Sequence, residues 1–94
     1  MRLHLSARVP NEGARRLAWW LGEPKDEAER VERRRRLVAL YSPAWIERAL
    51  AGDVVPGSAI GSVTGGEVLA TDFWLPPEGG WFTAPVSRQL RAAA

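Results

Sequence analysis

The sequence predicts a mainly α-helical protein, folded as a compact bundle of four to five short helices with a short N-terminal strand and an extended C-terminal tail. Three observations predict this fold class. Apolar residues recur at helical spacing in the segments before residue 41. Helix-start and helix-stop residues then divide the chain as far as residue 66. Only the first ten residues alternate as a strand does.

The chain has 94 residues, which is enough for one domain with a small core. We assign residues 1–76 to this domain, with residues 1–10 as a strand arm, and residues 77–94 to a linker and C-terminal tail. The linker assignment follows from "LPPEGG", in which proline and glycine interrupt any regular pattern.

The strand prediction covers residues 2–9. Apolar residues occupy every second position from Leu3 through Leu5 to Val9, and polar residues lie between them. Pro10 ends the pattern. A strand with one apolar face needs a partner strand, which either this chain or a second copy would supply.

Two amphipathic helices are expected next. The first runs from a cap at Asn11 to a stop at Gly22, and we expect Trp20 beside its apolar stripe in the core. We expect Trp74 in the core as well. The stripe consists of Ala14, Leu17, Ala18 and Leu21.

The second helix is predicted over residues 25–40, where three acidic residues each precede an arginine by four positions. Its apolar residues gather at the two ends and leave arginines between them, so we expect burial at both ends. These apolar residues are Ala28, Val31, Leu37, Val38 and Leu40.

A short helix is predicted over residues 43–51, because Ser42 is a good cap, Pro43 suits the first helical position and Gly52 ends the pattern. Its apolar face is Ile46, Ala49 and Leu50. A further helix is expected around residues 57–64, with Ala59, Ile60 and Val63 turned inward. Residues 67–74 then form either a brief strand or a last helical turn that begins at Thr71.

Charge is unevenly distributed. Residues 1–48 contain eleven Lys or Arg and seven Asp or Glu, a net +4, whereas residues 49–94 contain two and four, a net −2. A basic front half favours an anionic partner. The alternative is a solvated face on which the charges pair locally.

Several function classes have little support. Cysteine is absent, which excludes disulfides and thiol chemistry, and His4 is the only histidine. No serine has an evident base, so we expect neither an enzyme nor a metal or cofactor site. No apolar run approaches the length of a membrane span. A soluble protein in the cytoplasm, associated with the nucleoid, is the expectation.

Residues 42–74 carry the most specific pattern, and they resemble the helix-turn-helix domains of the phage repressor/Cro type, also called XRE-like. The first predicted helix also fits, so the resemblance covers about two thirds of the chain. The family usually has a glycine between its second and third helices, where this chain has Leu40 or Tyr41. The matching positions are Ser42, Ile46, Leu50-Ala51-Gly52, Pro56, Thr64-Gly65-Gly66-Glu67-Val68 and Asp72-Phe73.

The resemblance implies a sequence-specific DNA-binding transcriptional regulator of bacterial or phage type that acts on double-stranded DNA as a homodimer. Residues 43–51 would then be the recognition helix in the major groove. Its groove-facing residues would be Ser42, Pro43, Ala44, Trp45, Glu47 and Arg48.

Phosphate contacts are expected from Lys25, Arg34 and Arg35. Four consecutive helical residues span about 300° of the helix surface, so Arg33 to Arg36 cannot all face one duplex. Arg33 and Arg36 each follow a glutamate by four residues, which leaves Arg34 and Arg35 freer to bind DNA.

Surplus aromatic residues favour contact with a partner. Trp81 and Phe82 lie in the predicted tail, and we expect them to join Leu3 and Leu5 in a dimer or partner contact. The alternative function is a protein-interaction module on a helix-turn-helix scaffold. An antirepressor, an antitoxin-like partner, a phage inhibitor or an RNA polymerase-binding regulator would fit.

Overall fold

The computed structural model describes residues 8–88, and these residues form four α-helices and one 3-10 helix without any strand. The elements are α1 (Glu12–Gly22), α2 (Glu27–Leu40), α3 (Pro43–Leu50), α4 (Ala59–Val63) and the 3-10 helix η1 (Ala70–Trp74). The prediction of a compact, mainly helical fold is confirmed. Of the strand predicted over residues 2–9, residues 2–7 lie outside the described part, and Arg8 and Val9 are not in a strand.

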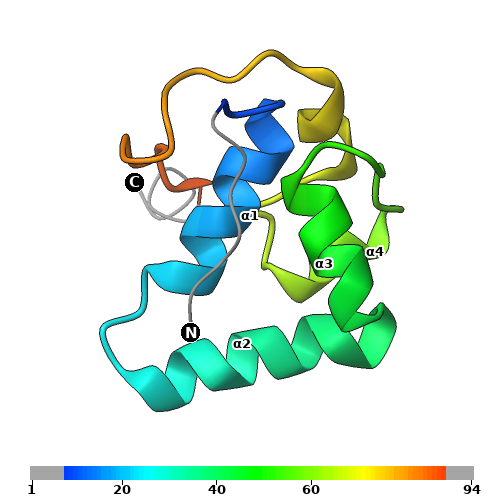
Figure 1. Ribbon diagram of the computed structural model, residues 1–94. Coiled ribbons are helices and arrows are strands. Elements are labelled where there is room, and N and C mark those ends of the chain that lie inside the picture. The colour runs from blue at the N-terminus through cyan, green and yellow to red at the C-terminus, as the bar shows by residue number, and fades with distance from the viewer. Residues whose placement is uncertain (1–7, 89–94) are drawn as a thin grey trace.

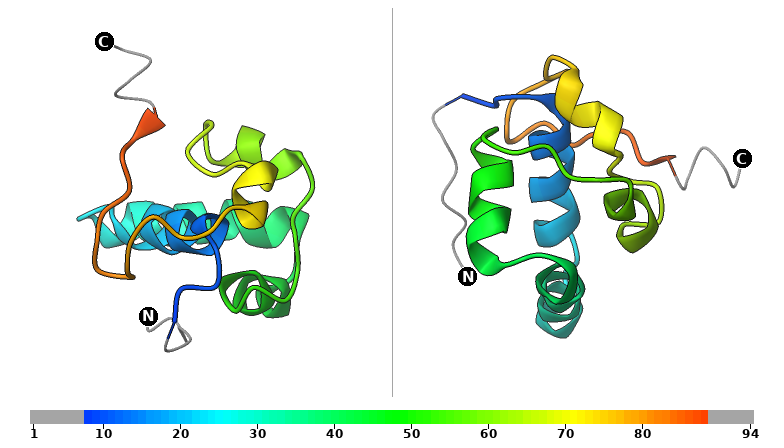
Figure 2. Two further views of the ribbon diagram at one scale, coloured as in Figure 1. Left: turned by 90° about the horizontal axis from the view of Figure 1, so that it is seen from above. Right: turned by 90° about the vertical axis from the view of Figure 1, so that its right-hand side faces the viewer.

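Helix α1 is the centre of the molecule. It lies between α3 on one side and α4 with η1 on the other, while α2 crosses the end of the α1–α3 layer (Figures 1 and 2). The Asn11 side chain accepts a hydrogen bond from the Ala14 N–H at 2.7 Å and caps the helix as predicted. The predicted stripe is buried in full, and Trp20 is buried beside it.

The closest packing of α1 is against η1. A Cβ atom placed on Gly13 would lie 2.3 Å from the Phe73 ring, so only glycine permits this approach. The residue after η1 is tied to the start of α1, because the Glu12 N–H donates to the Leu75 carbonyl at 3.0 Å.

Helix α2 begins at Glu27, two residues later than predicted, because the Asp26 side chain caps it by accepting from the Ala28 N–H at 3.0 Å. The expectation that both ends of α2 are buried holds only at the second end, where Leu37 is fully buried and Val38 is partly buried against the core. At the first end it was wrong, because Ala28 is exposed and Val31 is 62% exposed.

The connection from α2 to α3 consists of Tyr41 and Ser42. Both residues have extended backbones, with φ of −128° and −106°, so this turn requires no left-handed residue and no glycine. The Tyr41 ring stacks on Trp45, with ring centroids 3.7 Å apart and planes 9° apart. Ser42 caps α3 by accepting from the Trp45 N–H at 3.1 Å.

Helix α3 begins at Pro43 as predicted and ends at Leu50, one residue before the predicted end. Pro43 occupies the first turn, and three apolar residues are fully buried: Ile46, Ala49 and Leu50. Gly52 follows with a φ of +81°, a left-handed conformation that favours glycine. A Cβ atom there would also lie 2.6 Å from Pro10, which packs against this turn.

Helix α4 is shorter than predicted. Ile60 is fully buried and Val63 partly so, but Ala59 is exposed, contrary to the prediction. Residues 70–74 form the 3-10 helix η1, which begins one residue before Thr71, and not a strand. Trp74 is 75% exposed, so its assignment to the core was also wrong.

Residues 75–88 lie back along α1, and residues 75–87 contain no regular helix or strand; we name residues 75–88 the C-terminal strap (Figure 1). Glu12 accepts from the Glu78 N–H at 2.9 Å, and the Trp19 indole donates to the Trp81 carbonyl at 2.9 Å. Arg16 donates to the Val86 carbonyl at 3.1 Å. The segment predicted as linker and tail is therefore held against the domain as far as residue 88.

Candidate nucleic-acid interface

The outer face of α3 presents the residues predicted to enter the groove. Ser42, Pro43, Ala44 and Arg48 are exposed, and Glu47 is half-buried. Ala44, Glu47 and Arg48 are spaced i, i+3 and i+4, so they share one face of the helix. The opposite face anchors α3 through its buried apolar residues.

Trp45 differs from the other predicted groove residues. Its ring is half-buried because it stacks on Tyr41 at the α2–α3 connection. The same burial raises the pKa of the Tyr41 hydroxyl above its usual range, because desolvation disfavours the phenolate. Trp45 therefore supports the connection between the two helices.

The charged side chains of this face have no partner in the part of the chain that the structure describes. Neither Glu47 nor Arg48 makes a side-chain hydrogen bond or ion pair with any residue from 8 to 88. We name Ala44, Glu47 and Arg48 the α3 outer patch. It combines an unpaired carboxylate, an unpaired guanidinium and a small apolar side chain.

The arginines of α2 divide into paired and unpaired ones. Arg33 donates to the Trp20 carbonyl at 2.7 Å and to Glu23 at 3.0 Å, and its guanidinium lies 5.1 Å from the centre of the Trp20 ring. It also lies 3.7 Å from Glu29, the i, i+4 pairing expected from the sequence. Arg33 therefore connects α2 to the C-terminal end of α1.

The expectation that Arg35 is freer than Arg36 was wrong. Arg35 makes two hydrogen bonds to Glu32, at 2.8 and 2.6 Å, whereas Arg36 lies 3.6 Å from the same carboxylate. The i, i+3 spacing lets the guanidinium fork of Arg35 meet both carboxylate oxygens. These hydrogen bonds from Arg35 are the largest cause of the lowering of the pKa of Glu32 to about 2.

Arg34 makes no side-chain hydrogen bond or ion pair within residues 8–88, and its contact with DNA stays a prediction. It is half-buried, and its Nη1 atom is enclosed without a hydrogen-bond partner in the described chain. Arg34 lies one helical turn before Val38, in the half of α2 that leads to the α2–α3 connection.

Lys25 is separate from the α3 outer patch. It is exposed before the start of α2, while α3 follows the other end of the same helix. The fourteen residues of α2 span about 21 Å at 1.5 Å per residue. Lys25 and α3 can therefore touch one duplex only at well-separated points.

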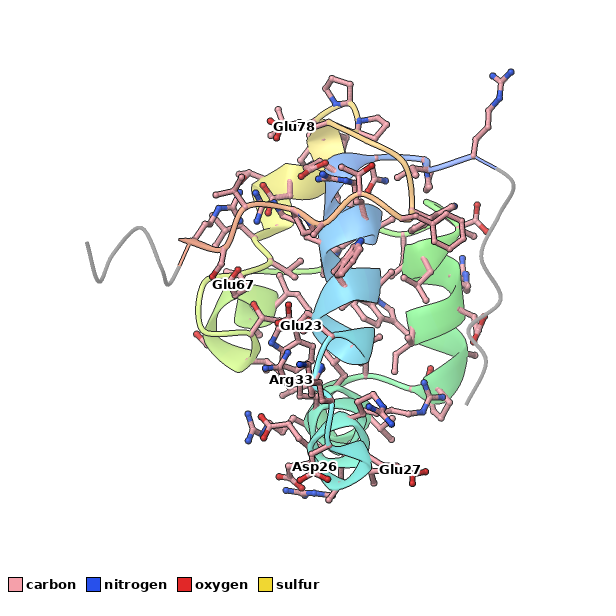
Figure 3. The ribbon with its side chains drawn as sticks, turned by 90° about the vertical axis from the view of Figure 1, so that its left-hand side faces the viewer. Glu23, Asp26, Glu27, Arg33, Glu67 and Glu78 are labelled. Carbon is pink, nitrogen blue, oxygen red and sulfur yellow. The ribbon has the colours of Figure 1, made fainter. Side chains whose placement is uncertain are left out.

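A cleft of about 280 Å³ lies on the side of the molecule away from α3, and nothing in the sequence pointed to it. Figure 3 shows Glu23 and Arg33 close together at its edge, between α1 and α2. Arg33 and Arg36, which line the cleft, both pair with glutamates. No group of three or more potential metal ligands occurs among residues 8–88.

The residues predicted for a dimer or partner contact differ in their exposure. Phe82 is 96% exposed, whereas Trp81 is half-buried and packs against the core. Leu3 and Leu5 lie outside the described residues. Trp74 was predicted to be in the core and not on the surface. From the sequence alone, a tryptophan next to a phenylalanine at an apolar segment favours burial, but only Phe73 is buried.

Comparison with known proteins finds no match, since no family model, no curated protein and no solved structure is similar to the chain at a significant level. In the described range, none of the helices has the length and apolar character that a membrane crossing requires.

Proposed function

We propose that the protein is a DNA-binding transcriptional regulator of the helix-turn-helix kind, with α2 and α3 as the two helices of the motif and α3 in the major groove. One observation carries the proposal. Helix α3 is anchored by three fully buried side chains, yet the charged residues on its outer patch pair with nothing in residues 8–88. A helix fits the major groove of B-form DNA, where side chains from its N-terminal part reach the base edges.

Phosphate contacts would come from arginines that have no side-chain partner among residues 8–88. Arg48 lies on α3, and Arg34 lies in the second half of α2, which leads to α3. Each phosphate that such a side chain neutralises releases counterions, so the affinity for DNA depends on salt. Arg35 takes less part, because its guanidinium is paired with Glu32.

We extend the proposal to a homodimer, because a two-fold symmetric regulator reads two half-sites about 10 bp apart, or a multiple of that. Phe82 is 96% exposed and is the described residue best suited to the dimer contact, together with the predicted Leu3 and Leu5. Light scattering on the protein and on Phe82→Ala measures this directly. A monomeric wild-type protein would contradict the dimer but leave the DNA proposal standing.

The DNA proposal is tested by fluorescence anisotropy with a labelled duplex at several salt concentrations. We expect the Arg48→Ala and Arg34→Gln variants each to lower the slope of log affinity against log salt by about 0.9. Arg35→Ala is the matched control and should lower the slope less, because Glu32 already compensates its charge. Salt-independent binding, or equal effects of all three variants, would count against the interface.

A protein-interaction module is the second candidate. The observation that favours it is the exposure of two large aromatic residues, Trp74 and Phe82, at 75% and 96%. In that case DNA affinity is weak and insensitive to Arg48, and Phe82→Ala or Trp74→Ala reduces binding to the protein partner.

A further inference from the structure

Glu47 is the only carboxylate within residues 8–88 that is half-buried and lacks a polar side-chain partner. Every other carboxylate that is buried or half-buried has one: Glu12 binds Arg15 and Arg16, Glu32 binds Arg35, Glu67 binds Ser87, and Asp72 binds Arg88. The other acidic side chains without a partner in this range are Glu27, Asp53 and Glu78, and all three are exposed.

Folding gives no reason for a carboxylate at position 47. Within residues 8–88 the Glu47 carboxylate gains no hydrogen bond or ion pair on folding, and alanine has a higher intrinsic helix propensity than glutamate. Glu47 also lies beyond the first turn of α3, so it gains little from the helix dipole. Its placement is explained if a binding partner supplies the missing donor.

The surroundings of Glu47 indicate which donor fits. Arg48 lies next to it and is also unpaired, and Ala44 shares the same face with no atom beyond Cβ to block a close approach. A carboxylate facing DNA is repelled by the phosphates, so it is tolerated only where a base offers it an amino group. In the major groove cytosine presents its N4 amino group, whereas adenine places the N7 acceptor beside its amino group.

We propose that Glu47 and Arg48 are specificity-determining residues that read a cytosine and a nearby guanine in the major groove. The cytosine N4 amino group donates to the Glu47 carboxylate, and the Arg48 guanidinium donates to guanine O6 and N7. This inference rests on the proposed DNA-binding function. The inference goes beyond that function because it assigns the Glu47 carboxylate a role in sequence specificity. The carboxylate weakens binding to every DNA site that lacks the cytosine.

The experiment is selection from a random duplex library with the full chain, followed by sequencing of the bound DNA. The wild type should enrich cytosine at one fixed position of the half-site, with guanine beside it. In the selected half-site, replacing that cytosine should weaken binding of the wild type roughly fivefold or more, and should hardly change binding of Glu47→Ala. Arg48→Ala should lose the guanine preference in the same way.

Two further readouts separate recognition from a structural role. Glu47→Ala should bind non-cognate duplex about twofold more tightly at low salt, because a charge that repels phosphate is removed. Its melting temperature should be equal to or higher than that of the wild type. Asp53→Ala is the matched control: it removes an exposed, unpaired carboxylate just after α3 and should leave the selected sequence unchanged.

The outcomes are distinct. If the wild type binds DNA in a salt-dependent way but Glu47→Ala selects the same cytosine, the inference is wrong and the proposed function stands. A lower melting temperature for Glu47→Ala would also overturn the inference, since it would reveal a structural role. If the wild type binds no duplex, the proposed function fails, and the inference fails with it.

Discussion

The α1–strap region and the outer patch of α3 use charged residues in opposite ways. In the α1–strap region every charged side chain that is buried has an ion-pair partner: Glu12 meets Arg15 and Arg16, and Asp72 meets Arg88 at 2.8 Å. On the α3 outer patch Glu47 and Arg48 have no partner in the described chain. The two regions contain the same residue types in similar helical settings, so composition does not account for the difference.

The contrast shows how so short a chain holds its irregular C-terminal segment. The chain contains no cysteine and its core is small, so ion pairs and hydrogen bonds replace disulfides in fastening the strap. Arg88 reaches Asp72 across sixteen positions of sequence, and Arg16 reaches Val86 across seventy. Charges that complete the fold are therefore paired, and the unpaired ones on α3 remain available to a partner.

The largest expected effect comes from breaking the buried network at Glu12, whose side chain is 2% exposed. Glu12→Ala leaves Arg15 and Arg16 buried without their carboxylate and removes the acceptor of the Glu78 N–H. We expect the free energy of unfolding to fall by about 3–5 kcal/mol. Urea denaturation followed by tryptophan fluorescence measures this fall.

The matched control is Glu78→Ala on the same strap. The Glu78 carboxylate is exposed and has no partner among residues 8–88, so its removal should change the free energy of unfolding by less than about 0.5 kcal/mol. Equal effects of the Glu12 and Glu78 variants would show that pairing in the α1–strap region does not stabilise the fold.

A smaller effect is expected at Asp72, and it depends on pH. Burial acts to raise the pKa of Asp72, but hydrogen bonds from Arg88 and from the Leu69 N–H outweigh it, so the pKa in the folded state lies below 3.8. The stabilisation by the carboxylate is therefore complete above pH 3.8 and is lost as the pH falls through the folded-state value.

Asp72→Asn tests this linkage. At neutral pH the variant should be less stable than the wild type by about 1–3 kcal/mol. The difference should shrink as the pH falls below 3.8 and through the lowered pKa of the folded state, because the wild-type carboxylate becomes protonated. Thermal unfolding of both proteins across this pH range measures it, and a difference that does not vary with pH would contradict the role of the charge.

The smallest effect is expected at the α2–α3 connection, where Tyr41 stacks on Trp45. Tyr41→Leu keeps an apolar side chain but removes the stacked pair, which should lower the free energy of unfolding by about 0.5–1.5 kcal/mol. Under the proposed function, the affinity for DNA should fall as well, because the stacked pair joins the α2–α3 connection to α3. Trp74→Leu, at a ring that is 75% exposed, is the control and should change neither quantity appreciably.

The sequence predicts the helices well where their boundaries depend on local chemistry. Asn11 and Ser42 cap their helices as predicted, and the apolar faces of α1 and α3 are buried as expected. Caps and apolar spacing act within one or two turns of helix, so they can be read from a single segment. The predicted groove residues other than Trp45 are on the outer side of α3 for the same reason.

The wrong predictions concern residues whose burial or pairing depends on a segment distant in the sequence or on a competing side chain. Val31 and Trp74 are apolar and were expected in the core, but no segment within residues 8–88 covers them. Arg35 was expected to be free, but it competes successfully with Arg36 for Glu32. Each of these outcomes is decided by the position of a second element or by a choice between two nearly equivalent partners.

Local chemistry thus accounts for where the helices begin and end and for which side of α3 is apolar, since caps, proline, glycine and spacing operate within each segment. Contacts between distant segments account for the rest: the return of the strap along α1, the ion pairs of Glu12 and Asp72, and the lack of a side-chain partner for Glu47 among residues 8–88. Whether a carboxylate finds a partner depends on which distant segments the fold brings within reach of it.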